Sequence, residues 1–201
     1  ADYLKKKSKK LFFAMESKDI CEKAIGTACS TKEELIKKCD LIVVLGGDGT
    51  FISVGRLMAE RSIPLLGVNM GQLGFLTEIK KGEVFEALDK ALQGKLPVSS
   101  RTMLECTLVR NGKKILRAPV VNDVVISKGA IARVFDMALS IDGSLVTNIK
   151  GDGIILSTPT GSTAYCLAAG GPVIHPEVPA IEIAAICPHS LTLRPLIIKE
   201  T

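Results

Sequence analysis

The residues with the clearest chemical potential form the motif Gly46-Gly47-Asp48-Gly49-Thr50, which directly follows the apolar run 41–45. The run predicts a short buried strand of a parallel sheet, and residues 51–61 have helical spacing. A glycine-rich turn between a strand and a helix presents backbone N–H groups to a phosphate. A carboxylate in that turn could accept a proton from an attacking hydroxyl or help to hold Mg²⁺. The alternative is a tight turn in which Asp48 only caps the helix.

Two other acidic residues, Asp123 and Asp152, lie where polar residues or glycines interrupt apolar segments. Asn122 and Asp123 interrupt an apolar strand, where two polar side chains are unfavourable to bury unless something binds them. Such a pair can hydrogen-bond ribose hydroxyls or an amide. Asp152 stands between two glycines, two residues after Lys150. Both places also have structural interpretations, a strand end for the Asn-Asp pair and a plain turn for Asp152.

Hydroxyl side chains are concentrated in residues 157–165, between the apolar strand 154–156 and an alanine-rich helical stretch. Helix capping would account for only one or two of them, so this turn could present hydroxyls and backbone donors to a polar ligand. A second loop, residues 69–76, follows the expected strand 64–68 and falls where open α/β sheets bind ligands. Its alternative role is to pack Phe75 into the core.

The composition argues against several kinds of function. The formal charge is +5, and residues 1–10 carry +4 of it through five lysines and one aspartate. This local basic stretch predicts a solvated helix end rather than a nucleic-acid-binding surface. The six cysteines form no C-x-x-C pair, and with two histidines they predict neither a disulfide framework nor a His/Cys metal site. No apolar run approaches the ~20 residues of a membrane helix, and no signal peptide is visible, so we expect a cytoplasmic protein without nucleic-acid or membrane partners.

The elements that must position these residues fall into two regions. Strand and helix signals alternate over residues 1–95, including helices at about 31–38 and 84–92, which predicts an α/β domain with a doubly wound, Rossmann-like parallel sheet. Later residues have strand patterns, at 101–110, 120–127 and 134–141, with hairpin turns at 111–112 and 142–143. We therefore expect an α/β domain over residues 1–98 and a mostly antiparallel β-sandwich domain over 99–201.

In their order and spacing, these motifs resemble the NAD kinase family. The resemblance runs from about residue 41 to residue 198 and rests on segments 46–50, 67–77, 122–123 and 151–165, with Ala169-Gly170-Gly171-Pro172 behind the last. The first motif alone also occurs in lipid kinases and phosphofructokinases, whereas the four together are highly specific. The resemblance implies transfer of the terminal phosphate of ATP, or of polyphosphate, to the 2′-hydroxyl of the adenosine ribose of NAD, giving NADP.

The resemblance also implies a role for each candidate residue. Asp48 would be the base that takes the proton from the 2′-hydroxyl. The donor phosphates, with Mg²⁺, would be held by Gly46, Gly47, Gly49 and Thr50. Asn122 and Asp123 would bind the ribose and adenine region of NAD, with Thr163, Ala164 and Tyr165 beside them. Asn69 and Phe75 would line the pocket, and Thr160 and Ser162 are further expected substrate-binding residues. Lys150 and Asp152 would reach the nicotinamide side in a neighbouring subunit's site, because the family forms homo-oligomers, which here implies a dimer or tetramer.

The sequence departs from the family pattern at several points. Position 123 is Asp where the family also has Glu, and Cys166 and Ala168 stand where it often has Ser. Family members have a further N-terminal strand and continue past residue 201, so we expect a piece of a longer protein whose β-rich domain is incomplete at its C-terminus. Two alternatives stay open. One is a lipid kinase, although the Pro-x-Gly-Thr-x-Asn-Asp block of that class is absent from residues 67–74; the other is a fragment that binds NAD without turnover.

Overall fold

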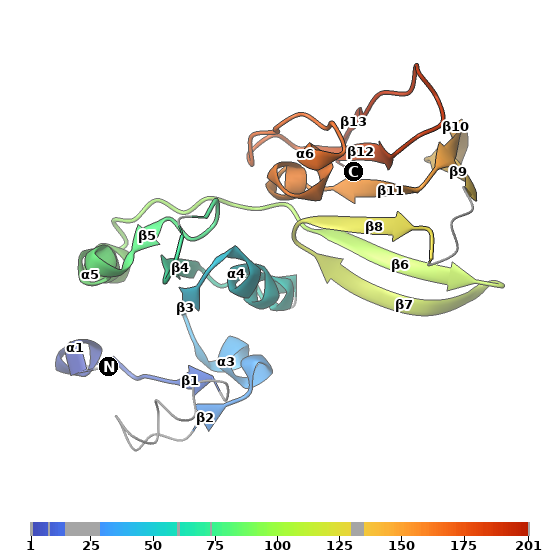
Figure 1. Cartoon of the computed structure of the whole chain (residues 1–201). Helices are drawn as coiled ribbons and strands as arrows, with labels where there is room; N and C mark the ends of the chain where they lie inside the picture. The colour runs from blue at the N-terminus through green and yellow to red at the C-terminus, as the bar shows by residue number, and fades with distance from the viewer. Residues whose placement is uncertain are drawn as a thin grey trace. The chain divides into compact units, whose positions relative to one another are not determined.

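The computed structural model describes residues 2–7, 9–14, 29–59, 61–72, 74–129 and 135–200 (Figure 1). The chain divides into two compact units, residues 1–98 and 99–201. Parts of the sequence interpretation fall on residues outside the described ones: Met15 at the end of the apolar run 11–15, Cys21, Leu73 in the loop that follows the expected strand 64–68, and Val134 at the start of the expected strand 134–141.

The first unit contains parallel strands connected by helices. Its main sheet has the order β3 (Ile42–Gly46), β4 (Leu65–Asn69) and β5 (Ile79–Lys80), and β1 (Phe13–Ala14) pairs in parallel with β2 (Cys29–Ser30). The helices are α1 (Asp2–Lys6), α3 (Lys32–Lys38), α4 (Asp48–Gly55) and α5 (Val84–Leu92), with 3-10 turns η2 (Arg56–Ala59) and η3 (Lys81–Glu83). Alternating parallel strands and helices confirm the predicted α/β class.

Local sequence explains where these helices begin and end. Thr31 caps α3, since its hydroxyl accepts the Glu34 N–H at 3.2 Å. Helix α5 buries Ala87 and Leu88, and the chain leaves it through Gly94, whose φ of +67° suits glycine. Helix α4 begins at Asp48, three residues before the expected start, with Gly47 as its N-cap. Because glycine has no side chain, the first-turn N–H groups of α4 have no side-chain cap.

The second unit is mostly antiparallel. A four-stranded sheet has the order β13 (Leu196–Lys199), β12 (Ala180–Ile186), β11 (Gly153–Ser157) and β8 (Asp123–Ser127). Two hairpins, β6 (Leu104–Arg110) with β7 (Lys113–Val120) and β9 (Phe135–Ile141) with β10 (Ser144–Gly151), turn at the expected Asn-Gly and Asp-Gly pairs, all with positive φ. The 3-10 turn η4 (Thr160–Thr163) and the short helix α6 (Tyr165–Ala168) follow β11.

The four-stranded sheet has apolar residues on both faces. On one face, Ile154 and Ile183 pack with Ile149 of β10, and on the other, Ile155 and Ala184 pack with the α6 cysteine. These two layers confirm the predicted mostly antiparallel domain. The expected strand over 120–127 is wrong in one respect: residues 121 and 122 form a bend between β7 and β8. The bend places the Asn-Asp pair at the beginning of β8 rather than inside a strand.

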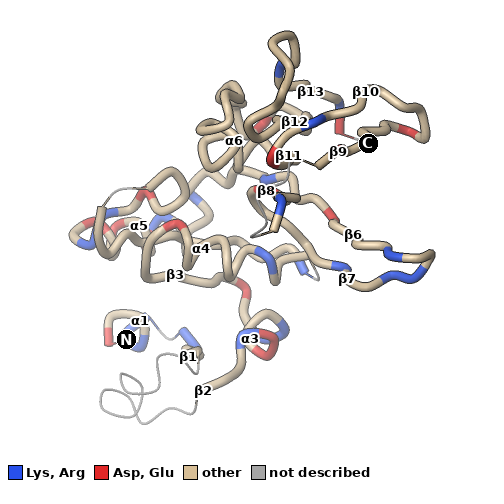
Figure 2. Tube along the Cα trace, turned by 45° about the vertical axis from the view of Figure 1, so that its right-hand side comes forward, with Lys and Arg blue, Asp and Glu red and all other residues tan. Residues whose placement is uncertain are grey.

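Charge is distributed unevenly along the described chain (Figure 2). Basic side chains follow one another in α1, which ends on Lys5 and Lys6, and near the tip of the β6–β7 hairpin at Arg110, Lys113 and Lys114. Lys7 pairs with Asp89 of α5 at 2.7 Å, so part of the N-terminal basic stretch is neutralised within the first unit. Among the described helices, none is long and apolar enough to cross a membrane.

Candidate functional site

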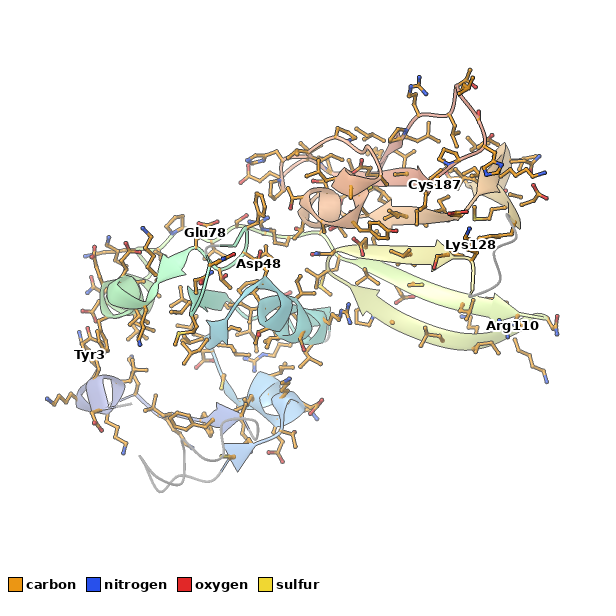
Figure 3. The ribbon with its side chains drawn as sticks, viewed as in Figure 1. Tyr3, Asp48, Glu78, Arg110, Lys128 and Cys187 are labelled. Atoms are coloured by element: carbon orange, nitrogen blue, oxygen red, sulfur yellow. The ribbon has the colours of Figure 1, made fainter. Side chains whose placement is uncertain are left out.

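The 46–50 turn lies at the carboxyl end of β3, and Asp48 is the first residue of α4 (Figure 3). Gly47 and Gly49 face open space, whereas the Thr50 side chain folds back against Gly46. The Phe51 N–H bonds to the Gly47 carbonyl at 3.1 Å, which closes the first turn of the helix. The earlier N–H groups are available to an anion, because a helix N-terminus carries donors and partial positive charge.

The Asp48 carboxylate accepts four hydrogen bonds from the loop that follows β4. Oδ2 accepts the Phe75 N–H at 2.8 Å, and Oδ1 accepts the Leu76 N–H, the Thr77 N–H and the Thr77 hydroxyl, each at 3.1 Å. Partial burial raises the pKa of Asp48, but these hydrogen bonds outweigh it and lower the pKa below its ordinary value. Asp48 is therefore ionised at neutral pH and fixed in one orientation.

Glycine at position 74 permits this arrangement. A Cβ built on Gly74 would overlap the Asp48 carboxylate, so any larger residue would separate the loop from the acid. The next residue, Phe75, has a side chain that is 69% exposed. The alternative in which this loop packs Phe75 into the core is therefore wrong, and the aromatic ring is available to contact a ligand.

Asn69 organises the same loop from the end of β4. Its Oδ1 accepts the Gly71 N–H at 2.7 Å, and its Nδ2 lies 2.6 Å from the Gln72 carbonyl and 3.0 Å from the Thr77 hydroxyl. The side chain is only 5% exposed. Asn69 was expected to line a pocket for NAD, but its amide is occupied by the loop. Any effect of Asn69 on a ligand would therefore pass through the loop.

In the second unit, the structure brings the Asn-Asp pair next to the hydroxyl-rich turn. Asp123 pairs with Ser157 across β8 and β11. The Thr158 N–H bonds to the Asn122 carbonyl at 2.8 Å, and the Thr158 hydroxyl bonds to the Val121 carbonyl at 2.6 Å. These contacts fasten the beginning of β8 to the start of the turn after β11.

Most hydroxyls of this turn are used within the protein rather than presented to solvent. Ser157, Thr158 and Ser162 are fully buried, and Thr160 is 8% exposed. The Ser162 hydroxyl donates to the Pro159 carbonyl at 2.7 Å and accepts the Ile174 N–H at 3.0 Å. The expectation that the whole run presents hydroxyls is therefore wrong for Ser157, Thr158 and Ser162. These side chains hold the turn in shape, and a direct contact of Ser162 with a ligand is not supported.

The outer side of the turn is different. Thr163 and Ala164 are half-buried and the Tyr165 ring is 47% exposed, so these three residues can reach a ligand. Beside them, the Oδ1 atom of Asn122 is buried, and no described group donates a hydrogen bond to it. A buried acceptor without a donor is unfavourable unless a ligand or water supplies one.

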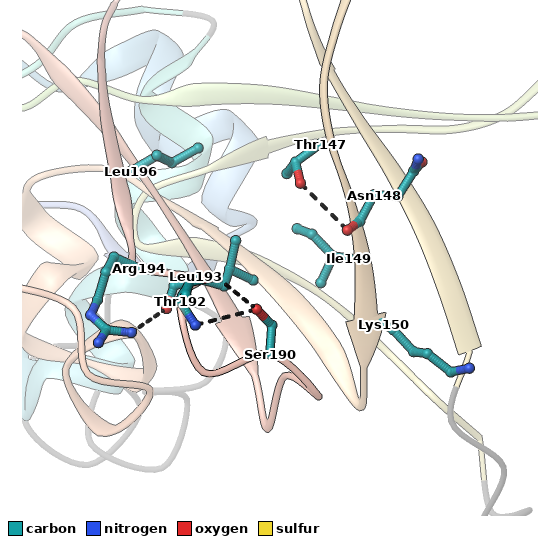
Figure 4. Close-up of a pocket in the computed structure, with 9 residues that line it drawn as sticks. All are labelled: Thr147, Asn148, Ile149, Lys150, Ser190, Thr192, Leu193, Arg194 and Leu196. Atoms are coloured by element: carbon teal, nitrogen blue, oxygen red, sulfur yellow. Dashed lines mark hydrogen bonds between the residues drawn. The ribbon is translucent and has the colours of Figure 1, made fainter.

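Lys150, in β10, and Asp152, just before β11, lie at the beginning of β11, whereas the hydroxyl-rich turn follows its end. Asp152 precedes β11 and the hydroxyl-rich turn follows it, so the length of β11, roughly 14 Å, separates them. The Asp152 carboxylate pairs with Lys128 at 2.7 Å, and Figure 3 labels Lys128 at this end. Lys150 lines a separate pocket of about 320 Å³, together with polar residues of β10 and of the loop at 190–194 (Figure 4).

The sequence interpretation did not identify three residues that the structure shows to be important: a hydrogen-bond partner of Asp48, an ion-pair partner of Asp152 and a buried acid. Thr77 belongs to the segment 67–77 that resembles the family, and its hydroxyl, a possible side-chain donor, is the signal that marks it. Lys128 pairs with Asp152 from just beyond the end of β8, which no local pattern indicates. Glu182 is a fully buried acid in β12, and the only signal for it is one charged residue in an otherwise apolar strand.

Comparison with known proteins identifies the family. The family model of the ATP-NAD kinase N-terminal domain matches residues 3–96, and that of the ATP-NAD kinase C-terminal domain matches residues 121–201. The NAD kinase of Geotalea daltonii is 52% identical over 168 residues, which cover 84% of this chain and 59% of that protein. The NAD kinase of Syntrophotalea carbinolica is 54% identical over 162 residues, 81% of this chain and 57% of that protein.

Solved structures agree with this result. The crystal structure of yeast NADH kinase complexed with NADH matches with a TM-score of 0.85 and 30% identity, covering 94% of this chain and 59% of that one. The structure of an NAD kinase from Archaeoglobus fulgidus in complex with ATP matches with a TM-score of 0.70 and 27% identity, covering 94% and 77%. This chain spans somewhat under two thirds of the length of the curated relatives named above. Both domain models are matched in order, and the chain belongs to the NAD kinase family.

Proposed function

We propose that the protein transfers the terminal phosphate of ATP to the 2′-hydroxyl of the adenosine ribose of NAD, giving NADP. The observation that carries this proposal is the Asp48 carboxylate, ionised and fixed by four hydrogen bonds at the first residue of a helix without a side-chain cap. An acceptor for the hydroxyl proton and donors for phosphate oxygens thus stand side by side. Membership of the NAD kinase family gives the identity of the two substrates.

The donor phosphates would bind the N–H groups of residues 46–50, where Gly47 and Gly49 leave the backbone open. Mg²⁺, the cation expected with ATP, fits this arrangement only as part of the substrate complex. The described residues contain no cluster of three His, Cys, Asp or Glu side chains that could cage a metal. Mg²⁺ commonly keeps its waters and binds mainly through substrate phosphates, whose charge it neutralises. Polyphosphate offers the same oxygens and is a second candidate donor.

Asp48 would act first as a hydrogen-bond acceptor for the 2′-hydroxyl. Its lowered pKa makes it a weak base but keeps it charged at neutral pH. Phosphoryl transfer has a loose transition state, so orienting the hydroxyl contributes more than early proton removal. We therefore place proton transfer to Asp48 late in the reaction.

NAD would be held mainly by the second unit, by Asn122, Asp123, Thr163, Ala164 and Tyr165. The Oδ1 of Asn122, which has no partner within the described part of the chain, suits a ligand that donates a hydrogen bond, such as the adenine amino group or the nicotinamide amide. For transfer to occur, the ribose of this NAD must reach Asp48 of the first unit. Phe75 of the first unit and Thr160 of the second are further candidate contacts for NAD.

Lys150 and Asp152 are too far along β11 from Asn122 to contact the same end of one NAD. We propose that they serve a site completed by another copy of the chain, in a cytoplasmic homo-oligomer, a dimer or tetramer. The Asp152–Lys128 ion pair at 2.7 Å supports a positioned rather than a free carboxylate. Family membership removes the support for a lipid kinase. Binding of NAD without turnover is the outcome that the experiment must separate from catalysis.

The test measures NADP formation from NAD with Mg²⁺-ATP, coupled to an NADP-specific dehydrogenase. The same assay is repeated with NADH and with polyphosphate. Turnover that is lost in Asp48→Asn supports the proposal. NAD binding by calorimetry without any NADP formation would overturn it in favour of a non-catalytic binding module.

A further inference from the structure

Thr77 lies between Asn69 and Asp48 in a single line of hydrogen bonds. The residue is fully buried. Its hydroxyl lies 3.0 Å from the Asn69 Nδ2 atom and 3.1 Å from the Asp48 Oδ1 atom. These distances are both within hydrogen-bond range, so the hydroxyl contacts an amide on one side and the carboxylate on the other.

The direction of this line follows from the donors and acceptors available. The Asn69 Oδ1 atom must face the Gly71 N–H, and its Nδ2 faces the carbonyl oxygens of Gln72 and Thr77, so the amide cannot be turned around. An amide nitrogen only donates, and the Thr77 oxygen therefore accepts from it. The one hydroxyl proton of Thr77 must then point at Asp48.

The consequence is an uneven use of the two Asp48 oxygens. Among the residues that the structure describes, Oδ1 receives three donors, whereas Oδ2 receives only the Phe75 N–H. A carboxylate oxygen has two lone pairs, so Oδ2 keeps acceptor capacity for a substrate hydroxyl while Oδ1 has none. Rotation of the carboxylate would break the hydrogen bond between the Thr77 hydroxyl and Oδ1, and would exchange the roles of Oδ1 and Oδ2.

We propose that Thr77 is a positioning residue of the phosphotransfer reaction: its hydroxyl, oriented by Asn69, anchors Oδ1 of Asp48 so that Oδ2 faces the acceptor hydroxyl. This inference rests on the proposed function. It assigns to the Thr77 side chain a role separate from that of its backbone, because the Thr77 N–H already bonds to Asp48 at 3.1 Å and holds the loop. Removal of the hydroxyl alone therefore leaves the loop fastened.

The test uses substitutions that differ in that hydroxyl. Thr77→Val removes it at nearly constant shape, and the pair Thr77→Ser and Thr77→Ala compares presence and absence of the hydroxyl in a smaller side chain. Thr107→Val, on the exposed surface of β6, makes the same chemical change in the second unit as a matched control. All are measured for kcat and for KM of NAD, with thermal unfolding recorded beside them.

We expect kcat to fall roughly 10- to 100-fold in Thr77→Val and Thr77→Ala, the value of one hydrogen bond to a charged group. KM for NAD stays within about twofold, because the interaction acts in the transition state. Thr77→Ser retains kcat within about threefold and Thr107→Val is unchanged. An equal kcat in the Ser and Ala variants, or a loss that falls on KM alone, would overturn the proposal. If Thr77→Val fails to fold, the Ser and Ala pair decides.

A measurement without turnover separates this inference from the proposed function. The side-chain carboxyl carbon of Asp48 is titrated by NMR in the unmodified protein and in the variants. Loss of the Thr77 hydroxyl should raise the titration midpoint of Asp48 in the Ala and Val variants but not in the Ser variant. An unmodified protein that forms no NADP would refute the function while this titration still judges the contact. Midpoints that do not differ would refute the positioning role.

Discussion

Two carboxyl groups, one in each unit, occupy opposite environments. Asp48 receives four hydrogen bonds from residues 75–77, whereas Glu182 is fully buried and neither of its oxygens has a partner among the described residues. Both acids lie against a glycine: a Cβ at Gly74 would overlap Asp48, and one at Gly171 would overlap Glu182. In both places a glycine lets the backbone come close to a carboxyl group. The two places differ in the hydrogen-bond donors that surround that group.

The difference in donors moves the two pKa values in opposite directions. Around Asp48, backbone N–H groups stabilise the charged form and outweigh partial burial, which lowers its pKa. Around Glu182, burial favours the neutral form and raises its pKa, and the nearby Cys166 thiol lowers it by less. Burial of an acid therefore does not by itself identify a functional site. The donors that surround the acid decide whether it is a charged acceptor or a neutral part of the core.

Replacement of Asp48 should have the largest effect. Asp48→Asn removes the charge and turns an NH₂ group toward the N–H donors of residues 75–77, so we expect kcat to fall roughly 10²- to 10⁴-fold while NAD binding is largely kept. Asp40→Asn, at a fully exposed carboxylate of the same unit, is the matched control. Steady-state rates and calorimetric NAD binding measure both. A variant at near-full rate would show that Asp48 has no part in the chemistry.

Gly74→Ala should have the next largest effect, because the added Cβ must displace the Asp48 carboxylate or the loop. We expect the free energy of unfolding to fall by about 1–3 kcal/mol, as in other overpacked sites, with kcat reduced as well. Gly71→Ala is the control, since a Cβ at Gly71 meets nothing within 4 Å. Denaturant unfolding of the two variants gives the comparison. Equal stability of Gly74→Ala and the unmodified protein would contradict the close approach.

The structural features around Asp48 that depend on residues close together in the chain could be predicted from the sequence. Branched apolar residues followed by glycines predicted β3 and the turn, because strand and turn preferences act over a few positions. The four bonds to Asp48 span 27 to 29 residues of chain and come mostly from backbone N–H groups. Almost every residue type has a backbone N–H, so these donors cannot be recognised from the sequence. Only the residue types at Gly74 and Thr77 are specifically required by the contact with Asp48.

In the hydroxyl-rich turn, the sequence suggested ligand contacts for side chains that the structure buries. Serine and threonine hydroxyls are equally suited to binding a ligand and to satisfying buried carbonyls, so their concentration over 157–163 could not tell the two uses apart. Ser162 bonds to Pro159 and Ile174 rather than to solvent. Burial depends on how the turn packs on β11 and β8, which is tertiary information. Glu182 escaped attention for the same reason, since only the sheet shows that its side chain faces α6.

Glu182→Gln tests the second carboxyl through its pH dependence. Because the pKa of Glu182 in the folded protein lies above its ordinary value, its contribution to stability is fully present below about pH 4.5 and is lost as pH rises through the folded pKa. Asp48 has the reverse sign, since its contribution is present above about pH 3.8 and is lost as pH falls through its lowered pKa. The melting temperature of Glu182→Gln should match that of the unmodified protein at pH 4 and exceed it by several degrees at pH 8.

The control for this prediction is Glu177→Gln, an exposed acid of the same unit. It should follow the unmodified protein at both pH values. A Glu182→Gln variant that is less stable at pH 8 would mean that the charged carboxylate has a partner in solution. In that case Glu182, like Asp48, would be stabilised in its charged form.

The smallest expected effect concerns the reactivity of the thiol next to Glu182. Burial, with the adjacent Glu182 carboxyl, raises the pKa of Cys166 to about 12, so almost no thiolate forms at pH 8. Cys187, which is exposed, should react with iodoacetamide in the folded protein, whereas Cys166 should react only when the second unit opens. Mass spectrometry of timed samples measures both, with a denatured sample as the control in which both react.

Because Glu182→Gln removes the pH-dependent penalty of the neighbouring acid, it should slow Cys166 labelling further at pH 8. Faster labelling of Cys166 in that variant would show that the thiol reacts within the closed unit, where loss of the Glu182 carboxyl lowers the pKa of Cys166.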